Sequence, residues 1–121
     1  MSALRGQRVL VTGASGFVAS HLLPRLAAAG ATTLALGPPD VPAPAGIAES
    51  FVADLRDREH TAAAIAAARP DAVVHLAAQS SAARSFEAPA ETFAVNTLGT
   101  WHLLEAVHTH APRARVLVVG T

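Results

Sequence analysis

The stretch Val9-Leu10-Val11-Thr12-Gly13-Ala14-Ser15-Gly16-Phe17-Val18-Ala19-Ser20-His21-Leu22 decides the fold of this chain, because an apolar strand pattern runs directly into closely spaced glycines and then a helix pattern. Gly13 and Gly16 permit a tight turn and the close approach of an anion, and a helix that begins there directs unpaired N–H groups and its positive dipole end at the same point. Ala19 is small enough for the helix to pack closely on the strand. The stretch predicts a pyrophosphate-binding turn, with an ordinary tight strand-to-helix turn as the alternative.

The bulk composition is that of a packed globular domain. The chain has 121 residues, of which 51% are hydrophobic and 15% charged, enough for one domain with its own core. Nine basic and nine acidic side chains give a formal net charge of zero, so charge gives no argument for nucleic acid or an anionic membrane as partner. The sequence has no cysteine, which removes disulfides, thiol catalysis and thiolate metal sites.

The amino-terminal residues show no targeting signal. Residues 1–8 lack the apolar segment of a signal peptide, and no apolar run approaches the roughly 20 residues needed to cross a bilayer. We interpret the sequence as that of a cytoplasmic protein.

Strand and helix patterns alternate along the chain, which is typical of a parallel sheet covered by helices on both faces. The sequence predicts an α/β fold, a doubly wound parallel sheet with strand order 3-2-1-4-5 and a ligand across the carboxyl ends of its strands. The expected strands are Arg8–Thr12, Thr32–Leu36, Ser50–Ala53, Ala72–His75 and Arg115–Val119. The expected helices are about Gly16–Ala29, Arg58–Ala68 and Ala90–His110.

Residues at the ends of these elements fit the same interpretation. Gly30 is expected to cap the end of the first helix and Asp57 the start of the second, and Pro89 suits the entry to the third. Pro24 lies inside the first helix, where it removes a backbone hydrogen bond and crowds the carbonyl of Ser20. We therefore expect a kink in that helix.

Residues 37–46 are too rich in proline for a helix. We expect a surface loop that carries the chain to the third strand. A linker between two domains is the alternative, although the flanking elements fit one sheet.

Four ordered segments carry a resemblance to a known superfamily. The first is the Gly-x-x-Gly-x-x-Ala turn, with Thr12 before it and Phe17 after its second glycine; the others are Ala-Asp-Leu at 53–55, Val-Val-His-Leu-Ala-Ala-Gln-Ser at 73–80 and Asn-Thr-Leu-Gly-Thr at 96–100. Together they resemble the short-chain dehydrogenase/reductase superfamily, specifically its extended, nucleotide-sugar-modifying branch. The resemblance implies a Rossmann-type sheet, NADP or NAD as cofactor, and hydride transfer at a nucleotide sugar.

The run from Gln79 to Pro89, followed by Thr92 and Val95, looks most like the GDP-mannose 4,6-dehydratases and the related GDP-4-keto-6-deoxymannose reductases. UDP-sugar epimerases and dTDP-sugar dehydratases share most of the same scaffold. The resemblance favours a GDP-hexose substrate and a homo-oligomeric full-length enzyme, and it implies nucleotide-sugar redox chemistry more securely than any one sugar.

The resemblance assigns cofactor contacts along the chain. It implies a pyrophosphate cradle from the backbone of the glycine turn and first helical turn, an adenine site after the third strand, and contacts to the nicotinamide ribose after the fourth. For Asp54 the alternative is a helix-capping or solvated acid, and for the residues after the fourth strand it is core packing. The amide of Asn96 is expected to tie the active-site loop to the sheet, with a surface position as its alternative. The expected cofactor residues are Gly13, Ser15, Gly16, Phe17, Val18, Asp54, Leu55, Leu76, Ala77, Ala78 and Asn96.

Side chains after the nicotinamide-side loop are candidates for the substrate. We expect Gln79, Ser80 and Arg84 to face the sugar or its diphosphate, since an arginine suits bidentate binding of a phosphate. A solvated charge at the flank of a helix is the alternative for Arg84.

The end of the second strand departs from the common pattern. Gly37 stands where NAD-preferring relatives place the acid that binds the ribose 2′-hydroxyl, and no arginine stands beside it for a 2′-phosphate. Loss of the acid removes the repulsion that would exclude NADP. We therefore expect NADP or mixed use of the two cofactors.

The six histidines do not predict a metal site. His108 and His110 diverge on a helix, and no carboxylate has the spacing of a zinc helix. His75 ends a strand and is interpreted as a packed core residue. The helix segment Trp101-His102-Leu103-Leu104 is expected to contact the sheet, with a face for a partner helix as the alternative.

The sequence contains no tyrosine and no lysine, whereas the resemblance implies a catalytic Ser/Thr followed by a Tyr-x-x-x-Lys pair after the fifth strand. Thr121 is in register with that Ser/Thr. We interpret residues 1–121 as the NAD(P)-binding part of a longer enzyme, truncated after the fifth strand and lacking the substrate domain, with an open strand edge and an uncovered apolar face. A half-domain completed by another chain and a non-catalytic dinucleotide-binding module or sensor are the alternatives.

Overall fold

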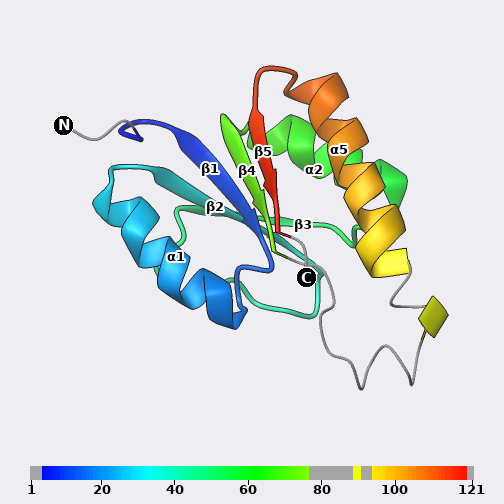
Figure 1. Cartoon of the computed structure of the whole chain (residues 1–121), viewed down its shortest axis with the longest axis horizontal. Coiled ribbons are helices and arrows are strands. Elements are labelled where there is room, and N and C mark those ends of the chain that lie inside the picture. Colours follow the sequence, from blue (N-terminus) through cyan, green and yellow to red (C-terminus); the bar gives the residue numbers. More distant parts are fainter. Residues whose placement is uncertain (1–3, 77–88, 91–93, 120–121) are drawn as a thin grey trace.

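The computed structural model describes residues 4–76, 89–90 and 94–119. These residues form a parallel sheet with helices on both faces (Figure 1). The strands are β1 (Arg8–Thr12), β2 (Thr32–Gly37), β3 (Glu49–Val52), β4 (Ala72–His75) and β5 (Arg115–Val118). The helices are α1 (Phe17–Ala28), α2 (Arg58–Ala68), the π-helix η1 (Ala94–Leu98) and α5 (Gly99–His110).

The sheet has the order β3-β2-β1-β4-β5, and every neighbouring pair is parallel. The predicted strand order is therefore confirmed. Strands β1 and β4 coincide with their predicted ranges, β2 and β5 differ by one residue at their carboxyl ends, and β3 begins and ends one residue earlier than predicted. Strand β1 lies in the middle and pairs with both β2 and β4. The carboxyl end of β1 therefore lies between the carboxyl ends of these two strands.

Strand β1 is buried on both faces, as expected for the centre of a parallel sheet. Residues 9–12 are each no more than 2% exposed. Leu10 packs against the α2 and α5 side, whereas Val9 and Val11 pack against the α1 side. This alternation holds the start of the glycine turn between two apolar layers.

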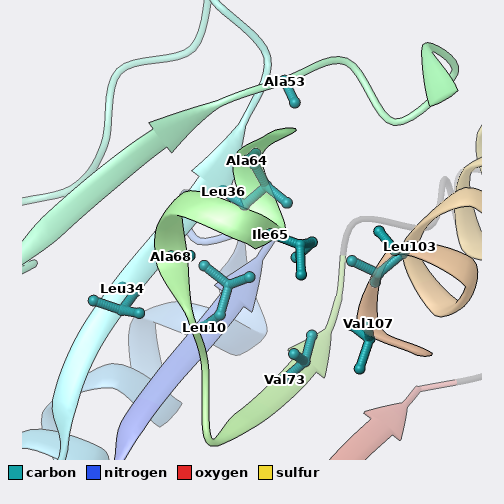
Figure 2. Close-up of a cluster of buried hydrophobic side chains, with 11 residues drawn as sticks. Leu10, Leu34, Leu36, Ala53, Ala64, Ile65, Ala68, Val73, Leu103 and Val107 are labelled. Atoms are coloured by element: carbon teal, nitrogen blue, oxygen red, sulfur yellow. The ribbon is translucent and has the colours of Figure 1, made fainter. Parts of the chain in front are cut away.

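The larger apolar cluster fills the space between the sheet and helices α2 and α5 (Figure 2). Ile65 and Leu103 are fully buried in it, and the small side chains of Ala64, Ala68 and Ala106 let the two helices approach closely. Strands contribute Leu10, Leu34, Leu36 and Val73, and Ala53 follows β3. The smaller cluster lies under α1, where Ala19 is fully buried against the sheet as its size predicts.

Helix ends follow their capping residues. The C-cap of α1 is Ala29, and Gly30 follows it with φ +89° and an N–H that donates to the Ala27 carbonyl at 3.0 Å. The Asp57 side chain accepts a hydrogen bond from the His60 N–H at 2.9 Å and caps α2, as predicted. Pro24 lies within α1, which continues to Ala28, and the expected kink stays a prediction.

The third expected helix is more complex than the uniform helix 90–110 of the sequence analysis. The segment Ala94–Leu98 is a π-helix, and the α-helix begins only at Gly99. The Thr100 hydroxyl donates to the Asn96 carbonyl at 3.0 Å. An α-helical turn would give that carbonyl to the Thr100 N–H, so the side chain competes with the regular ladder there.

Strand β5 lies at the edge of the sheet, and its apolar side chains are largely open. Leu117 pairs with Val74, on the face that α1 covers further along the sheet, and is 59% exposed. Val118 and Val119 are 43% and 41% exposed. The expectation of an uncovered apolar surface at β5 is confirmed for the described residues.

No helix in the described part of the chain is long and apolar enough to cross a membrane.

Candidate functional site

A cleft of about 640 Å³ opens at the carboxyl ends of β1, β2 and β3. Its walls are three segments that are far apart in the sequence: residues 13–15 after β1, residues 35–44 at the end of β2 and beyond it, and residues 50–56 at the end of β3 and beyond it. Its volume lies within the range of small-molecule and cofactor sites. Ligands of open α/β sheets bind at this edge.

The glycine turn forms one wall of the cleft. Gly13 has φ +71°, a conformation that side chains with a Cβ rarely adopt. The Gly16 N–H donates to the Gly13 carbonyl at 3.0 Å, and a Cβ added at Gly16 would lie 3.2 Å from that same oxygen. The turn therefore favours glycine at 13 by its backbone conformation, and a side chain at 16 would crowd the Gly13 carbonyl.

Helix α1 begins at this turn with its end uncapped by a side chain. Gly16 is the N-cap and makes no side-chain hydrogen bond, and the first turn contains no acidic residue. Phe17 and Val18 are 79% and 55% exposed, and the Phe17 ring packs edge-on against His21 with centroids 4.8 Å apart. The first N–H groups and the positive end of the helix dipole thus face an open surface, which suits an anion.

Asp54 and Arg56 form an ion pair in the wall after β3. The Asp54 carboxylate accepts hydrogen bonds from the Arg56 backbone N–H at 2.9 Å, from Nε at 3.0 and 3.2 Å and from a terminal guanidinium nitrogen at 2.6 Å. These hydrogen bonds lower the pKa of Asp54 from its ordinary 3.8. The carboxylate therefore stays ionised, and its hydrogen bonds to Arg56 fix its position in the wall of the cleft.

The structure separates the roles of the two acids in the Asp-Leu-Arg-Asp run. Asp57 caps α2, so Asp54 is not the helix cap that formed one alternative for it. Asp54 and Leu55 both line the cleft with Gly13 and Ser15, as the adenine and pyrophosphate assignments require. Sequence reasoning missed Arg56, since its pairing with Asp54 depends on the turn after β3.

Gly37 ends β2 and lies in the same cleft. No atom lies within 4 Å of a Cβ built there, so the position has room for a side chain. Asp40 and Arg56 line this cleft as well. The expectation that no arginine stands beside Gly37 holds for its sequence neighbours, but the fold brings Arg56 into the same cleft.

The nicotinamide-side assignments are only partly within the described residues. The Leu76 N–H donates to the Thr12 backbone carbonyl at 3.2 Å and to the Thr12 hydroxyl at 3.0 Å, which places Leu76 beside the glycine turn. Asn96 is half-buried in η1, so both its assigned role and the surface alternative stay open. Ala77, Ala78, Gln79, Ser80, Arg84 and Thr121 lie outside the described residues.

Two of the histidines, His75 and His102, make hydrogen bonds to other elements of the fold. His75 is fully buried between two threonine hydroxyls, which confirms its interpretation as a packed residue. The His102 Nδ1 lies 2.7 Å from the Leu55 carbonyl oxygen. Within residues 4–76, 89–90 and 94–119, no cluster of three or more His, Cys, Asp or Glu side chains is placed to hold a metal ion.

The expectation that the segment 101–104 of α5 contacts the sheet is only partly right. Leu103 is fully buried in the core, as expected, whereas Trp101 and Leu104 are 64% and 40% exposed. The sequence Trp-His-Leu-Leu places three apolar residues in one helical turn. Which of them faces the sheet depends on the rotation of the helix about its axis, and the sequence pattern does not determine that rotation.

The fold and the site together define a class. A parallel sheet in the order 3-2-1-4-5, a glycine turn after its central strand, and a cleft from that turn to an acid after β3 are the features of a Rossmann-type dinucleotide-binding protein. A family model described as the NAD dependent epimerase/dehydratase family matches residues 9–121, and the chain belongs to that family. The expected cofactor class, NADP or NAD, agrees with this description.

The relatives of this chain differ from one another in activity. The chain is 41% identical over 111 residues to CDP-glucose 4,6-dehydratase of Salmonella typhimurium, with 85% of this chain and 31% of the relative covered. It is 42% identical over 102 residues to GDP-6-deoxy-D-mannose reductase of Pseudomonas aeruginosa, with 84% and 29% covered. A solved structure of Thermus thermophilus UDP-glucose 4-epimerase in complex with NAD matches with a TM-score of 0.76 and 40% identity, covering 86% of this chain and 34% of that protein. The chain thus spans about a third of the length of these relatives.

The Asp54–Arg56 pair predicts a pH-dependent change in stability. Because its pKa is lowered in the folded state, Asp54 contributes stability above its ordinary pKa of 3.8, and this is lost as the pH falls through the lowered value. We expect Arg56→Gln to reduce the free energy of unfolding by at most ~1 kcal/mol at pH 7, since both side chains are half-exposed. The difference from wild type should disappear well below pH 3.8.

Urea unfolding at several pH values measures this effect, and Arg113→Gln is the control because Arg113 is exposed on the turn before β5. A loss of stability in Arg56→Gln that persists unchanged at the lowest pH would contradict the assignment.

Proposed function

We propose that this chain is the cofactor-binding portion of an NAD(P)-dependent enzyme that modifies nucleotide sugars, as a 4,6-dehydratase, a 4-ketoreductase or an epimerase. The observation that carries the proposal is the cleft that joins the left-handed Gly13 turn to the oriented Asp54 carboxylate across the carboxyl ends of three strands. Membership of the family supports the same conclusion.

The cleft and the start of α1 beside it fit a dinucleotide. Backbone N–H groups of the turn and the first turn of α1, at Gly13, Ser15, Gly16, Phe17 and Val18, would hold the pyrophosphate, because the helix end carries no competing acid. Asp54 and the Leu55 backbone would bind the adenine. Leu76, with Ala77 and Ala78 after it, would lie along the nicotinamide ribose, and the amide of Asn96 in η1 would tie that segment to the sheet.

The dinucleotide would supply the hydride acceptor and donor for the sugar. The described residues bind and orient it, and the proton transfer requires groups that the 121-residue sequence lacks, since it contains neither tyrosine nor lysine. Thr121 is proposed as the Ser/Thr partner of that proton transfer. A non-catalytic dinucleotide-binding module is the second candidate; the missing tyrosine and lysine fit this module and fit equally a chain that is one part of a longer enzyme.

The sugar nucleotide stays a prediction. We propose a GDP-hexose, with Gln79, Ser80 and Arg84 on the sugar or diphosphate side, and a cytoplasmic location for the enzyme. The 42% identity to GDP-6-deoxy-D-mannose reductase supports the GDP preference. The 41% identity to CDP-glucose 4,6-dehydratase supports instead a dehydratase whose substrate carries a different nucleotide.

A homo-oligomer is proposed from the outer face of α5. Leu98, the last residue of η1, and Trp101 and Leu104 of α5 lie three residues apart and are 43%, 64% and 40% exposed, so they form an apolar stripe from the end of η1 along α5. We expect wild type to self-associate in sedimentation velocity and Trp101→Arg to shift the distribution toward monomer. His108→Arg adds the same charge on the exposed last turn of α5 and is the control. A wild-type chain that stays monomeric at high concentration would contradict this proposal.

The dinucleotide site is tested by calorimetric titration of the chain with NAD(H) and NADP(H). We expect saturable binding that Gly13→Val abolishes, because a β-branched residue cannot adopt φ +71° without displacing the turn. Gly6→Val is the matched control: Gly6 has φ +76° but precedes β1 at the opposite end of the strand. Asp54→Ala should weaken binding of both dinucleotides alike. Failure of a folded wild-type chain to bind either dinucleotide would reject the proposed function.

Gly37 predicts cofactor selectivity. We expect wild type to bind NADH and NADPH with similar affinity, because β2 ends without a carboxylate. Gly37→Asp has room for its side chain and should weaken NADPH relative to NADH by about tenfold, since the added carboxylate repels a 2′-phosphate. Gly37→Asn has the same shape without the charge and should leave the ratio of the two dissociation constants near the wild-type value. An equal ratio in all three proteins would show that Gly37 does not face the ribose.

A further inference from the structure

Three segments that the proposed function uses meet at the buried ring of His75. Thr12 ends β1 directly before the glycine turn, His75 ends β4 directly before Leu76, and Thr100 lies in the first turn of α5. The Thr12 hydroxyl oxygen lies 2.7 Å from His75 Nδ1, and the Thr100 hydroxyl oxygen lies 2.9 Å from His75 Nε2. Both ring nitrogens are thus engaged by hydroxyls from other elements.

The other hydrogen bonds of the two hydroxyls give the chain a direction. The Thr100 hydroxyl donates its single proton to the Asn96 carbonyl at 3.0 Å, so its oxygen can only accept from His75. His75 Nε2 therefore carries a hydrogen. In a neutral imidazole the other nitrogen is then an acceptor, and the Thr12 hydroxyl donates to Nδ1 while its oxygen accepts from the Leu76 N–H at 3.0 Å.

The surroundings of the ring favour this neutral form. His75 is fully buried, and burial lowers its pKa from the ordinary value of 6.5. An imidazolium would donate from both nitrogens and force the Thr12 hydroxyl to give up its donation to Nδ1. Within the described residues, every buried side-chain nitrogen and oxygen has a hydrogen-bond partner.

We infer that His75, as its Nε2–H tautomer, is a positioning residue for the dinucleotide site: it holds the end of β1, the end of β4 and the turn at Asn96 in one fixed relation. The hydrogen-bond chain runs from the Leu76 N–H through Thr12, His75 and Thr100 to the Asn96 carbonyl. It connects the pyrophosphate turn to the segments assigned to the nicotinamide side. The positioning role rests on the proposed function, whereas the tautomer assignment does not.

The tautomer is read directly from the wild-type chain. Long-range ¹H–¹⁵N correlation spectra of protein labelled with ¹⁵N-histidine distinguish the two tautomers and the imidazolium, and we expect the Nε2–H pattern for His75 at pH 7.5. His75→Gln identifies the signal by its disappearance. An Nδ1–H pattern or a doubly protonated ring would overturn the hydrogen-bond chain.

The positioning role is read from cofactor affinity. Thr100→Val removes the hydroxyl that joins His75 to Asn96 and keeps the side-chain shape. We expect it to raise the dissociation constants of NADH and NADPH at least about fivefold, because one hydrogen bond between the two halves of the site is lost. Thr33→Val is the matched control: Thr33 is a buried β2 residue whose hydroxyl donates to the Gly46 carbonyl at 3.3 Å. It should leave both dissociation constants unchanged even where it lowers stability as much as Thr100→Val does.

The outcomes separate the inference from the function beneath it. Unchanged affinity in Thr100→Val, with wild type binding dinucleotide, overturns the positioning role and leaves the proposed function standing. Absence of binding by wild type, with the expected tautomer, overturns the proposed function and the positioning role together, while the hydrogen-bond chain remains as a structural feature.

Discussion

Burial of β1 on both faces is the constraint on which the rest of the structure depends. Residues 9–12 carry apolar or hydrogen-bonded side chains that are almost completely excluded from water, so the strand must lie between helices on both sides. Its neighbours β2 and β4 then run parallel to it, and their carboxyl ends meet its own. The glycine turn is placed where all these ends converge, and the cleft is a consequence of that placement.

Much of this arrangement is encoded locally and was predictable. The ranges of β1 and β4 follow from short apolar runs between turn signals, and Asp57 and Gly30 mark helix ends by their own chemistry. The strand order followed from the alternation of strands and helices and from the resemblance, since a right-handed crossover leaves few topologies. These features need no knowledge of contacts between distant residues.

The features that escaped prediction depend on side chains that meet only in the folded chain. The hydroxyl of Thr12 and the ring of His75 are 63 residues apart in sequence, and no periodicity links them. Arg56 is close to Asp54 in sequence, but the hydrogen bonds from its guanidinium to the Asp54 carboxylate form only because of the turn between β3 and α2. The exposed position of Trp101 and the π-helix before α5 depend on helix phase, which a mixed apolar run leaves open.

The two kinds of burial have different effects in this molecule. The apolar clusters on either face hold the layers together, but they tolerate small relative shifts of the strand ends, because dispersion and hydrophobic contacts have little direction. A dinucleotide that spans several strand ends needs those ends fixed to a fraction of an ångström. Hydrogen bonds of defined direction at His75 supply that restriction, at the desolvation cost of burying an imidazole and two hydroxyls. An apolar side chain at 75 would fill the same volume. It would, however, remove the hydrogen bonds that join the Thr12 hydroxyl at the end of β1 to the Thr100 hydroxyl beside Asn96. The polar core of this sheet is therefore better explained by the geometry of its ligand edge than by stability.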